Sequence, residues 1–581
     1  MSSAIAAFCL LLGGAGADSV EAVDKELAEL AATGKITDRK NYDPLAEKFA
    51  RRFAALNELK IDEAFADDKS KIEEWFAAHP AVRVKLHAAF SEKDDVVAGL
   101  KLFRAIWKKH ADKLEKYDDL AVATVVVWDQ PRNVHDFNHH ARRTKSEVPG
   151  GQVGGIENFE YALANDAALG GKAQFLPWEF LVFVIDHTTP LEERKWAQRY
   201  VAASRGKKSW HQDVPYDYDM LNGERGQSTR PHLEGKPYTL PNIREFGGVC
   251  AMQADFAARV GKSALTPACY CSGASAHRGG HAWWMFVRID AATEKGAIKC
   301  SLVSDGRFDG KDQFHTGGLR DPQTGEDMLD RDMERRLAVT GRDVVAKRHA
   351  DLCMRAYSIV AESEKYDFKK RLAFLDKVLK LAPYEEAAWS ELANQARFGE
   401  IDAKARAAML TRLSGMSKLF AAYPDFLWKH FGNMMRAVEK PKERSKLWGQ
   451  VVAAFIAAGR PDLTCAAAAE LADELAERKS FAEAGRTLQD AVRKFPYEGR
   501  YVPKLLGQFE KLGGEYKGGQ VEVARLYVEL LPAMFDYYKS ADDDYCKKMI
   551  EQATKYLDAN GLADYSQKIR ALAANADRKK K

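Results

Sequence analysis

The sequence predicts an α+β fold in three parts, in which helical segments lie on both sides of a mixed central domain. Three observations support this prediction. Residues 18–125 space their apolar side chains three and four positions apart, as amphipathic helices do. Between residues 126 and 340, glycine, proline and short β-type runs become frequent. From residue 341 to 575 the helical spacing returns, with proline at repeated intervals.

Residues 1–17 resemble a secretory signal peptide. An apolar stretch from Ala4 to Leu12 is followed by Ala15-Gly16-Ala17, a pattern of small residues typical of a cleavage site. No Lys or Arg precedes the stretch, so an ordinary buried N-terminus is the alternative. The stretch is too short to span a bilayer, and no later run is long enough to do so. We therefore expect an exported protein, periplasmic or extracellular, with no integral membrane segment.

The length and charge of the chain limit the remaining possibilities. A chain of 581 residues is too long for one hydrophobic core. Its 88 basic and 84 acidic side chains nearly balance, so we expect no nucleic-acid or membrane-surface partner. Eight cysteines include Cys9, which would leave with the signal peptide. The other seven allow up to three disulfides and one free thiol in an oxidising compartment.

The two helical parts and the central part each have clear segments. We expect N-terminal helices over 23–34, 43–59 and 96–117, where charges lie opposite the apolar positions. In the central domain, β-type runs predict strands over 120–128, 175–185, 267–273, 281–289 and 297–304. The central domain is therefore the mixed α+β part of the chain.

The C-terminal part, residues 341–575, resembles an array of tetratricopeptide-like repeats. Helical runs end at prolines that are 41, 37, 35 and 36 residues apart, close to the 34 residues of that repeat. These prolines are Pro383, Pro424, Pro461, Pro496 and Pro532. Pro441 and Pro503 do not fit the series, so an irregular helical bundle is the alternative. A stacked array would offer an extended surface to a protein partner.

The stretch "GGVCAMQADFAARVGKS", residues 247–263, places Cys250 at the start of an expected helix. Gly247 and Gly248 allow a close approach of the backbone, and Val249, Met252, Phe256 and Val260 form one helical face. A helix N-terminus lowers the pKa of a thiol, and its first amides can stabilise an oxyanion. A lone cysteine at a helix start is otherwise a small buried residue.

Two later residues would complete a nucleophilic site. His281 begins a strand-like run in which His281, Trp283 and Met285 share one face. Asp305 ends the next strand-like run and would orient the imidazole. Asp290 and Asp309 are rivals for that role, although Asp290 ends the same strand as His281 and is a poor partner by geometry.

Residues 238–290, "YTLPNIREFGGVCAMQADFAARVGKSALTPACYCSGASAHRGGHAWWMFVRID", resemble the core of the transglutaminase-like superfamily, a papain-like cysteine fold. The matched core covers about 238–326. The resemblance implies that Cys250 attacks a carboxamide or peptide carbonyl, with His281 as base and then acid. Asp305 would be the orienting carboxylate, although it lies farther from the histidine than is usual in the family. The implied protease, amidase or transglutaminase-type enzyme acts on a protein or peptide substrate and needs no cofactor or metal.

Several other residues have side chains that could bind a metal or assist catalysis. Asn242 is a candidate for the side-chain oxyanion donor. Cys269, Cys271, His277 and His281 have ligand types suited to zinc, but Cys269 and Cys271 flank Tyr270 in a short strand and would both face an apolar core. Two further groups read as surface or structural: His135, His139 and His140 as a polar surface segment, and Cys300, Cys353, Cys465 and Cys546 as packing residues.

A second function comes from a different class. Fold does not guarantee catalysis, so the central domain is alternatively a binding module without catalytic activity. The helical array would then be the scaffold on which a partner protein docks.

Overall fold

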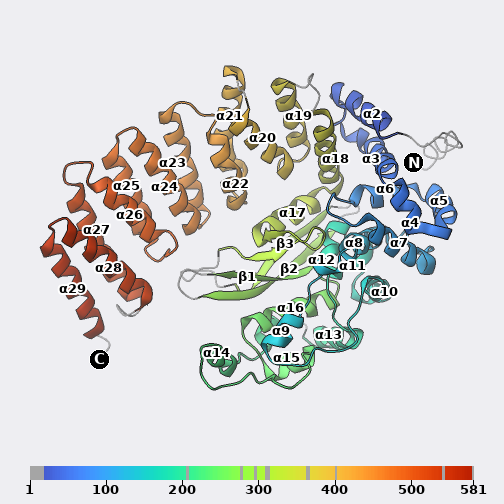
Figure 1. Ribbon diagram of the computed structural model, residues 1–581, viewed down its shortest axis with the longest axis horizontal. Helices are drawn as coiled ribbons and strands as arrows, with labels where there is room; N and C mark the ends of the chain where they lie inside the picture. Colours follow the sequence, from blue (N-terminus) through green and yellow to red (C-terminus); the bar gives the residue numbers. More distant parts are fainter. Residues whose placement is uncertain are drawn as a thin grey trace. The chain divides into compact units, whose positions relative to one another are not determined.

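The computed structural model describes residues 19–204, 209–274, 279–292, 297–307, 315–361, 367–399, 402–538 and 543–578 (Figure 1). Predicted strand 297–304 and the region around Asp305 fall within these ranges. The expected signal peptide, His277 and Asp309 lie outside the described residues. The chain forms two compact units. The first holds the described residues up to Ser272, Ala282–Arg307 and Gly318–Ala388, and the second holds those of Gly273–His281, Phe308–Gly317 and Trp389–Lys581.

The N-terminal part of the first unit is helical, as predicted. Its helices are α2 (Val20–Ala32), α3 (Tyr42–Leu56), α4 (Glu58–Phe65), α5 (Lys69–Ala78), α6 (Pro80–Ala89) and α7 (Val96–His110). Buried apolar side chains such as Val23 and Leu27 in α2 recur at helical spacing. The amphipathic pattern therefore identified these helices because one face of each is buried and the other is exposed to solvent.

Helices also make up most of the segment that leads to the sheet. They are α8 (Asp118–Trp128), α9 (Asn138–Arg143), α10 (Gly155–Asn165), α11 (Lys172–Phe175), α12 (Trp178–Ile185), α13 (Leu191–Ala203), α14 (Tyr218–Glu224), α15 (Leu240–Phe246) and α16 (Cys250–Ser263). Short 3-10 turns occur at Arg39–Asn41, Ala66–Asp68, Pro131–Asn133, Ala167–Leu169 and His211–Asp213.

Two predicted strands, 120–128 and 175–185, are wrong, because these runs form α8 and α12. Every residue of α8 from Leu120 to Val127 is buried, as is every residue of α12 from Phe180 to Ile185. A helix that is buried all round carries no alternation of polar and apolar residues, so its sequence reads like a buried strand. The two helices pack against each other in the core of the first unit.

The central sheet has the order β3-β2-β1-β4-β5. Its strands are β1 (Ala268–Ala274), β2 (Gly280–Ala292), β3 (Ile298–Asp305), β4 (Gly318–Arg320) and β5 (Asp327–Leu329). The strands predicted over 267–273, 281–289 and 297–304 are confirmed. β2 and β3 pair antiparallel with Trp284 opposite Asp305, and a bulge lies between Ile289 and Ala291. The mixed α+β character of this part is therefore confirmed.

The sheet is covered by a helix on each face (Figure 1). Ala257 and Ala258 of α16 pack with Ala268 of β1 and Trp284 of β2 on one face. On the other face, Met333 of α17 (Asp330–Arg342) contacts Cys269 of β1, with 3.5 Å between the two sulfur atoms. The alternation of side chains along β1 and β2 thus separates an α16 face from an α17 face.

Helices continue to the end of the described chain. They are α18 (Val344–Ala361), α19 (Phe368–Leu381), α20 (Glu386–Phe398), α21 (Ala403–Leu419), α22 (Pro424–Met435), α23 (Pro441–Ala457), α24 (Pro461–Glu477), α25 (Phe481–Lys494), α26 (Val502–Gly513), α27 (Gly519–Tyr538), α28 (Asp544–Ala559) and α29 (Ala563–Arg578). From α23 onward, successive helices pack side by side and share one apolar core (Figure 1). The expected C-terminal helical array is confirmed.

The prolines of the array occupy different positions relative to the helices. Pro424 and Pro461 occupy the first residues of α22 and α24, where a missing N–H leaves no hydrogen bond unmade. Pro441 begins α23 in the same way, although it does not fit the sequence interval. The proline spacing predicts that Pro532 ends a helical run. In the structure it lies inside α27 instead. Proline spacing alone therefore misplaces some repeat boundaries.

Among the described residues, no helix combines the length and apolar character that crossing a membrane requires. The seven cysteines of the described chain are all free thiols. Cys269, Cys271, Cys353, Cys465 and Cys546 are buried, and Cys250 and Cys300 are half-buried.

Candidate functional site around Cys250

Cys250 is the first residue of α16, as the sequence predicts. Its N-cap residue is Val249, whose apolar side chain makes no capping hydrogen bond to the first turn. Burial differs sharply along this helix: the Cys250 side chain is half-buried, whereas the residues that follow from Ala254 to Ser263 are buried. The thiol thus stands at the accessible, positive end of an otherwise buried helix.

The two glycines before Cys250 are required by their surroundings. Gly247 has a φ of +84°, and a Cβ there would overlap the carbonyl oxygen of Pro215. Gly248 donates its N–H to that same carbonyl at 3.0 Å and accepts from the N–H of Asp217 at 3.1 Å. The segment around residue 216 consequently runs parallel to the chain that enters α16, with Tyr216 bridged to Gly248.

Three polar side chains interact electrostatically with the Cys250 thiol. The pKa of Arg143 in α9 is raised, chiefly by its hydrogen bonds to Glu224 and in part by Cys250. Burial, followed by the charge of Cys250, raises the pKa values of Tyr216 and Tyr270. Each of these residues carries a phenol O–H, which can donate a hydrogen bond. A guanidinium and two phenols suit an anionic sulfur or a developing oxyanion.

His281 is the second residue of β2 and is half-buried. It belongs to the second compact unit, whereas Cys250 belongs to the first. Alternation along β2 puts His281 on the face of Trp283 and Met285 and puts Ala282 on the opposite face. Ala282 is the residue that packs in the apolar cluster against which Cys250 lies.

Asp305 ends β3, as predicted, and its carboxylate has three described partners, Trp284, His211 and Ser209. Trp284 Nε1 donates to Asp305 Oδ2 at 3.0 Å, and His211 Nδ1 lies 3.3 Å from the same oxygen. Burial would raise the pKa of Asp305, but the hydrogen bonds from His211, Ser209 and Trp284 outweigh it and lower the pKa. The structure therefore brings Asp305 to His211, a histidine that the sequence had not singled out. The Cys–His–Asp triad stays a prediction.

The other candidates have ordinary roles. Asp290 accepts a hydrogen bond from Arg288 at 3.1 Å, and Asn242 donates its side-chain N–H to the carbonyl of Pro237 at 2.8 Å. Cys269 and Cys271 both face the α17 side, with 3.7 Å between their sulfur atoms. Within the described part of the chain, no three His, Cys, Asp or Glu side chains are grouped so as to hold a metal ion.

The expected surface position is confirmed for His139, which is exposed, but it is wrong for His140, which is buried, and for His135, which is half-buried and contacts α16. His135 Nε2 lies 2.8 Å from Asp255 Oδ1, and Asp255 is fully buried one turn after Cys250. His140 is 2% exposed, and neither of its ring nitrogens has a hydrogen-bond partner in the described structure. Burial lowers the pKa of His140 to about 3, so its ring is neutral. Its centroid lies 5.2 Å from that of Tyr270.

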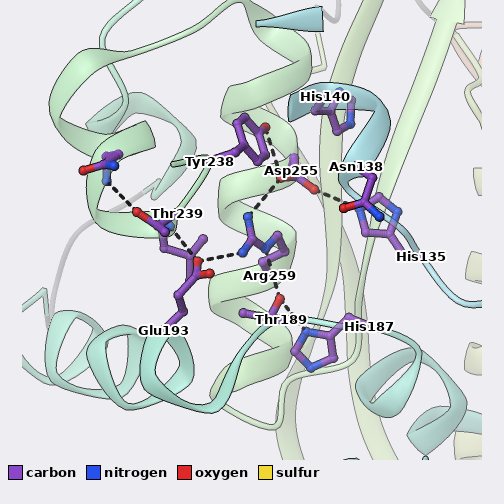
Figure 2. Close-up of polar contacts among 12 residues, drawn as sticks. His135, Asn138, His140, His187, Thr189, Glu193, Tyr238, Thr239, Asp255 and Arg259 are labelled. Carbon is purple, nitrogen blue, oxygen red and sulfur yellow. Dashed lines mark hydrogen bonds and ion pairs between the residues drawn. The ribbon is translucent and has the colours of Figure 1, made fainter. Parts of the chain in front are cut away.

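A buried polar network holds α16 behind the thiol (Figure 2). Arg259 Nη2 donates to Glu193 Oε2 at 2.7 Å, and Arg259 Nη1 lies 3.5 Å from Asp255 Oδ2. Tyr238 donates its O–H to that same Oδ2 at 3.2 Å, and His135 Nε2 lies at Oδ1. Burial would raise the pKa of Asp255, but the hydrogen bond of His135 and the charge of Arg259 hold it well below its usual value. Asp255 is thus a fixed anion that ties His135 and Tyr238 to α16, and Arg259 ties Glu193 of α13 to the same helix.

Comparison with known proteins adds no identity. No protein-family model matches the sequence, and no curated protein matches it. One solved structure, described as a circular tandem repeat protein with novel repeat topology and enhanced subunit contact surfaces, matches over 96% of both chains. The sequence identity is 8% and the TM-score is 0.14, and a likeness this low carries no argument about fold or function. The geometry around Cys250 is therefore the basis for any functional assignment.

Proposed function

We propose that the protein performs cysteine-dependent acyl transfer or amide hydrolysis on a protein or peptide substrate, with Cys250 as the nucleophile. One observation carries the proposal: a half-buried thiol is the first residue of α16 and interacts electrostatically with the guanidinium of Arg143 and the phenols of Tyr216 and Tyr270. A helix N-terminus and a nearby cation both favour the thiolate, which is the reactive form of cysteine.

The proposed reaction has two steps. The Cys250 sulfur attacks the carbonyl carbon of an amide, and the collapsing tetrahedral intermediate expels an amine and leaves a thioester. Water then gives a carboxylic acid, or a second amine gives a new amide, and either step releases the thiol. The resemblance assigns the proton transfers to His281, as base toward the thiol and acid toward the leaving amine. Asp305 stays the proposed orienting carboxylate, although Trp284 donates to its Oδ2 and His211 Nδ1 lies 3.3 Å from the same oxygen.

The test is the rate of alkylation of Cys250 by iodoacetamide as a function of pH. All measurements use the Cys300→Ala background, because Cys300 is the other half-buried thiol of the described chain. We expect Cys250 to react with an apparent pKa well below the value of about 8.5 for a free thiol. His281→Ala should move that pKa upward, whereas His232→Ala, which removes a half-exposed imidazole from the same chain, should not.

A midpoint near 8.5 that is unchanged by His281→Ala would contradict the proposal. It would favour the second candidate, a binding module without catalytic activity whose partner docks on the helical array. The observation behind that candidate is the array of α23–α29, because stacked helices suit protein interaction. Export through residues 1–17 stays a prediction, which N-terminal sequencing of the mature protein would check.

A further inference from the structure

The backbone of Tyr216 has hydrogen-bonding groups that the described structure leaves open. Tyr216 is bridged in parallel to Gly248, and both hydrogen bonds of that bridge are made by its neighbours: Pro215 accepts and Asp217 donates. The N–H and C=O of Tyr216 itself therefore point to the opposite edge, because a strand alternates the side on which it bonds. No backbone or side-chain hydrogen bond of the described residues uses either group.

This open edge continues the site around Cys250. Gly248, the bridge partner, comes two residues before Cys250 in the chain. Burial, and then the electrostatic interaction with Cys250, raises the pKa of the Tyr216 phenol. A backbone N–H and C=O spaced along one edge are satisfied together by another extended backbone, as in recognition by strand addition. A small polar ligand would satisfy one of the two groups but supplies no second one at that spacing.

Two aromatic rings stand at the same edge. Tyr216 is 37% exposed and Tyr218 is 67% exposed, and their ring centroids lie 5.0 Å apart. Asp217 between them is buried: its carboxylate accepts from the backbone N–H groups of Met220 and His232. The two hydrogen bonds of Asp217 hold the backbone between the two tyrosines. Exposed rings are suited to an apolar side chain of a ligand.

We propose that Tyr216 and Tyr218 form the substrate-recognition edge of the Cys250 site, and that they bind a peptide in extended conformation with an aromatic or large aliphatic side chain. The inference rests on the proposed function and specifies its substrate. The peptide backbone pairs with the N–H and C=O of Tyr216, and its apolar side chain packs on the two rings. An extended chain advances about 3.3 Å per residue, so an amide within a few residues of that side chain reaches the thiol.

Binding is measured on Cys250→Ala, so that no reaction consumes the probe. The probes are short fluorescein-labelled peptides in which one phenylalanine moves along a background of threonine and glutamine, read by fluorescence anisotropy. We expect the best phenylalanine position to bind about fivefold tighter than the background peptide, the range of an aromatic pair across strands. Tyr218→Ala should abolish that preference, whereas Phe398→Ala, which removes another exposed ring, should leave it intact.

N-methylation of the best peptide tests the backbone pairing. Methyl groups on one set of alternate residues should weaken binding about fivefold or more, and methyl groups on the other set should have little effect, because only one edge of a strand bonds. Equal effects of both sets, or no preference for phenylalanine, would overturn the inference. So would a dimer, detected by light scattering, that Tyr218→Ala dissociates, because a second copy would then occupy the edge. Alkylation of Cys250 needs no peptide, so the proposed function and this inference can fail separately.

Discussion

Arg259→Met tests whether the buried network behind Cys250 is essential to the first unit. The guanidinium is fully buried, bonds Thr189 at 3.0 Å and Glu193 at 2.7 Å, and lies 3.5 Å from Asp255. Its carbon also lies 3.9 Å from the ring centroid of Phe137. Methionine fills much of the same volume but leaves two buried carboxylates without their cation. Removing one partner of a buried ion pair destabilises by about 3–5 kcal/mol.

Hydrogen exchange read by mass spectrometry measures this effect within one chain. An opening free energy lower by about 3–5 kcal/mol accelerates exchange in α16 roughly 150- to 4,000-fold. Helix α26 of the second unit is the internal reference and should exchange at its original rate. Adding Glu193→Gln to Arg259→Met should recover about 1–2 kcal/mol, because it neutralises one stranded charge. A change in α16 below about 1 kcal/mol, or an equal change in α26, would refute the reasoning.

Two further predictions concern stability. Gly247→Ala should destabilise the first unit by about 2–4 kcal/mol, because a residue with a Cβ is strained at this positive φ and the Cβ would clash with Pro215. The control in the same exchange measurement is Gly150→Ala, where a Cβ meets nothing within 4 Å. Burial, and then the charge of Asp94, raise the pKa of Asp129 to about 7, so its carboxyl progressively destabilises the folded state as pH rises from about 4 to 7. Asp129→Asn should therefore stabilise the protein at pH 8 and have little effect at pH 4 in urea unfolding, and the same gain at both pH values would contradict this.

The local start of α16 could be predicted from sequence because its signals are short in range. Gly247, Gly248 and the apolar face that follows Cys250 lie within one stretch, and the structure has a helix over Cys250–Ser263. Strands β2 and β3 could also be predicted, since β2 contains a run of aromatic and β-branched residues and β3 is a short run that includes Ile298, Leu302 and Val303. Helices α8 and α12 were not, because burial on all sides removes the periodic signal.

The polar surroundings of the thiol could not be predicted from sequence. His135 and Asp255 are 120 residues apart, and a histidine in a polar stretch gives no sign that a buried carboxylate will bond to it. Asp255 and Arg259 do carry a weak signal, since this charged pair, four residues apart, lies among mostly apolar residues of α16. His211 meets Asp305 in the same way, through a fold that no local pattern encodes.

The C-terminal helices have a mechanical consequence. From α23 to α29, the packing joins each helix mainly to the next one or two along the chain, so cohesion there is passed from neighbour to neighbour. A force applied at the C-terminus would meet α29 and α28 first and would peel the stack in successive steps, each releasing about one helix pair. The force–extension record would show a series of steps, and the first unit, which holds most of the sheet and Cys250 of α16, would unfold only after them.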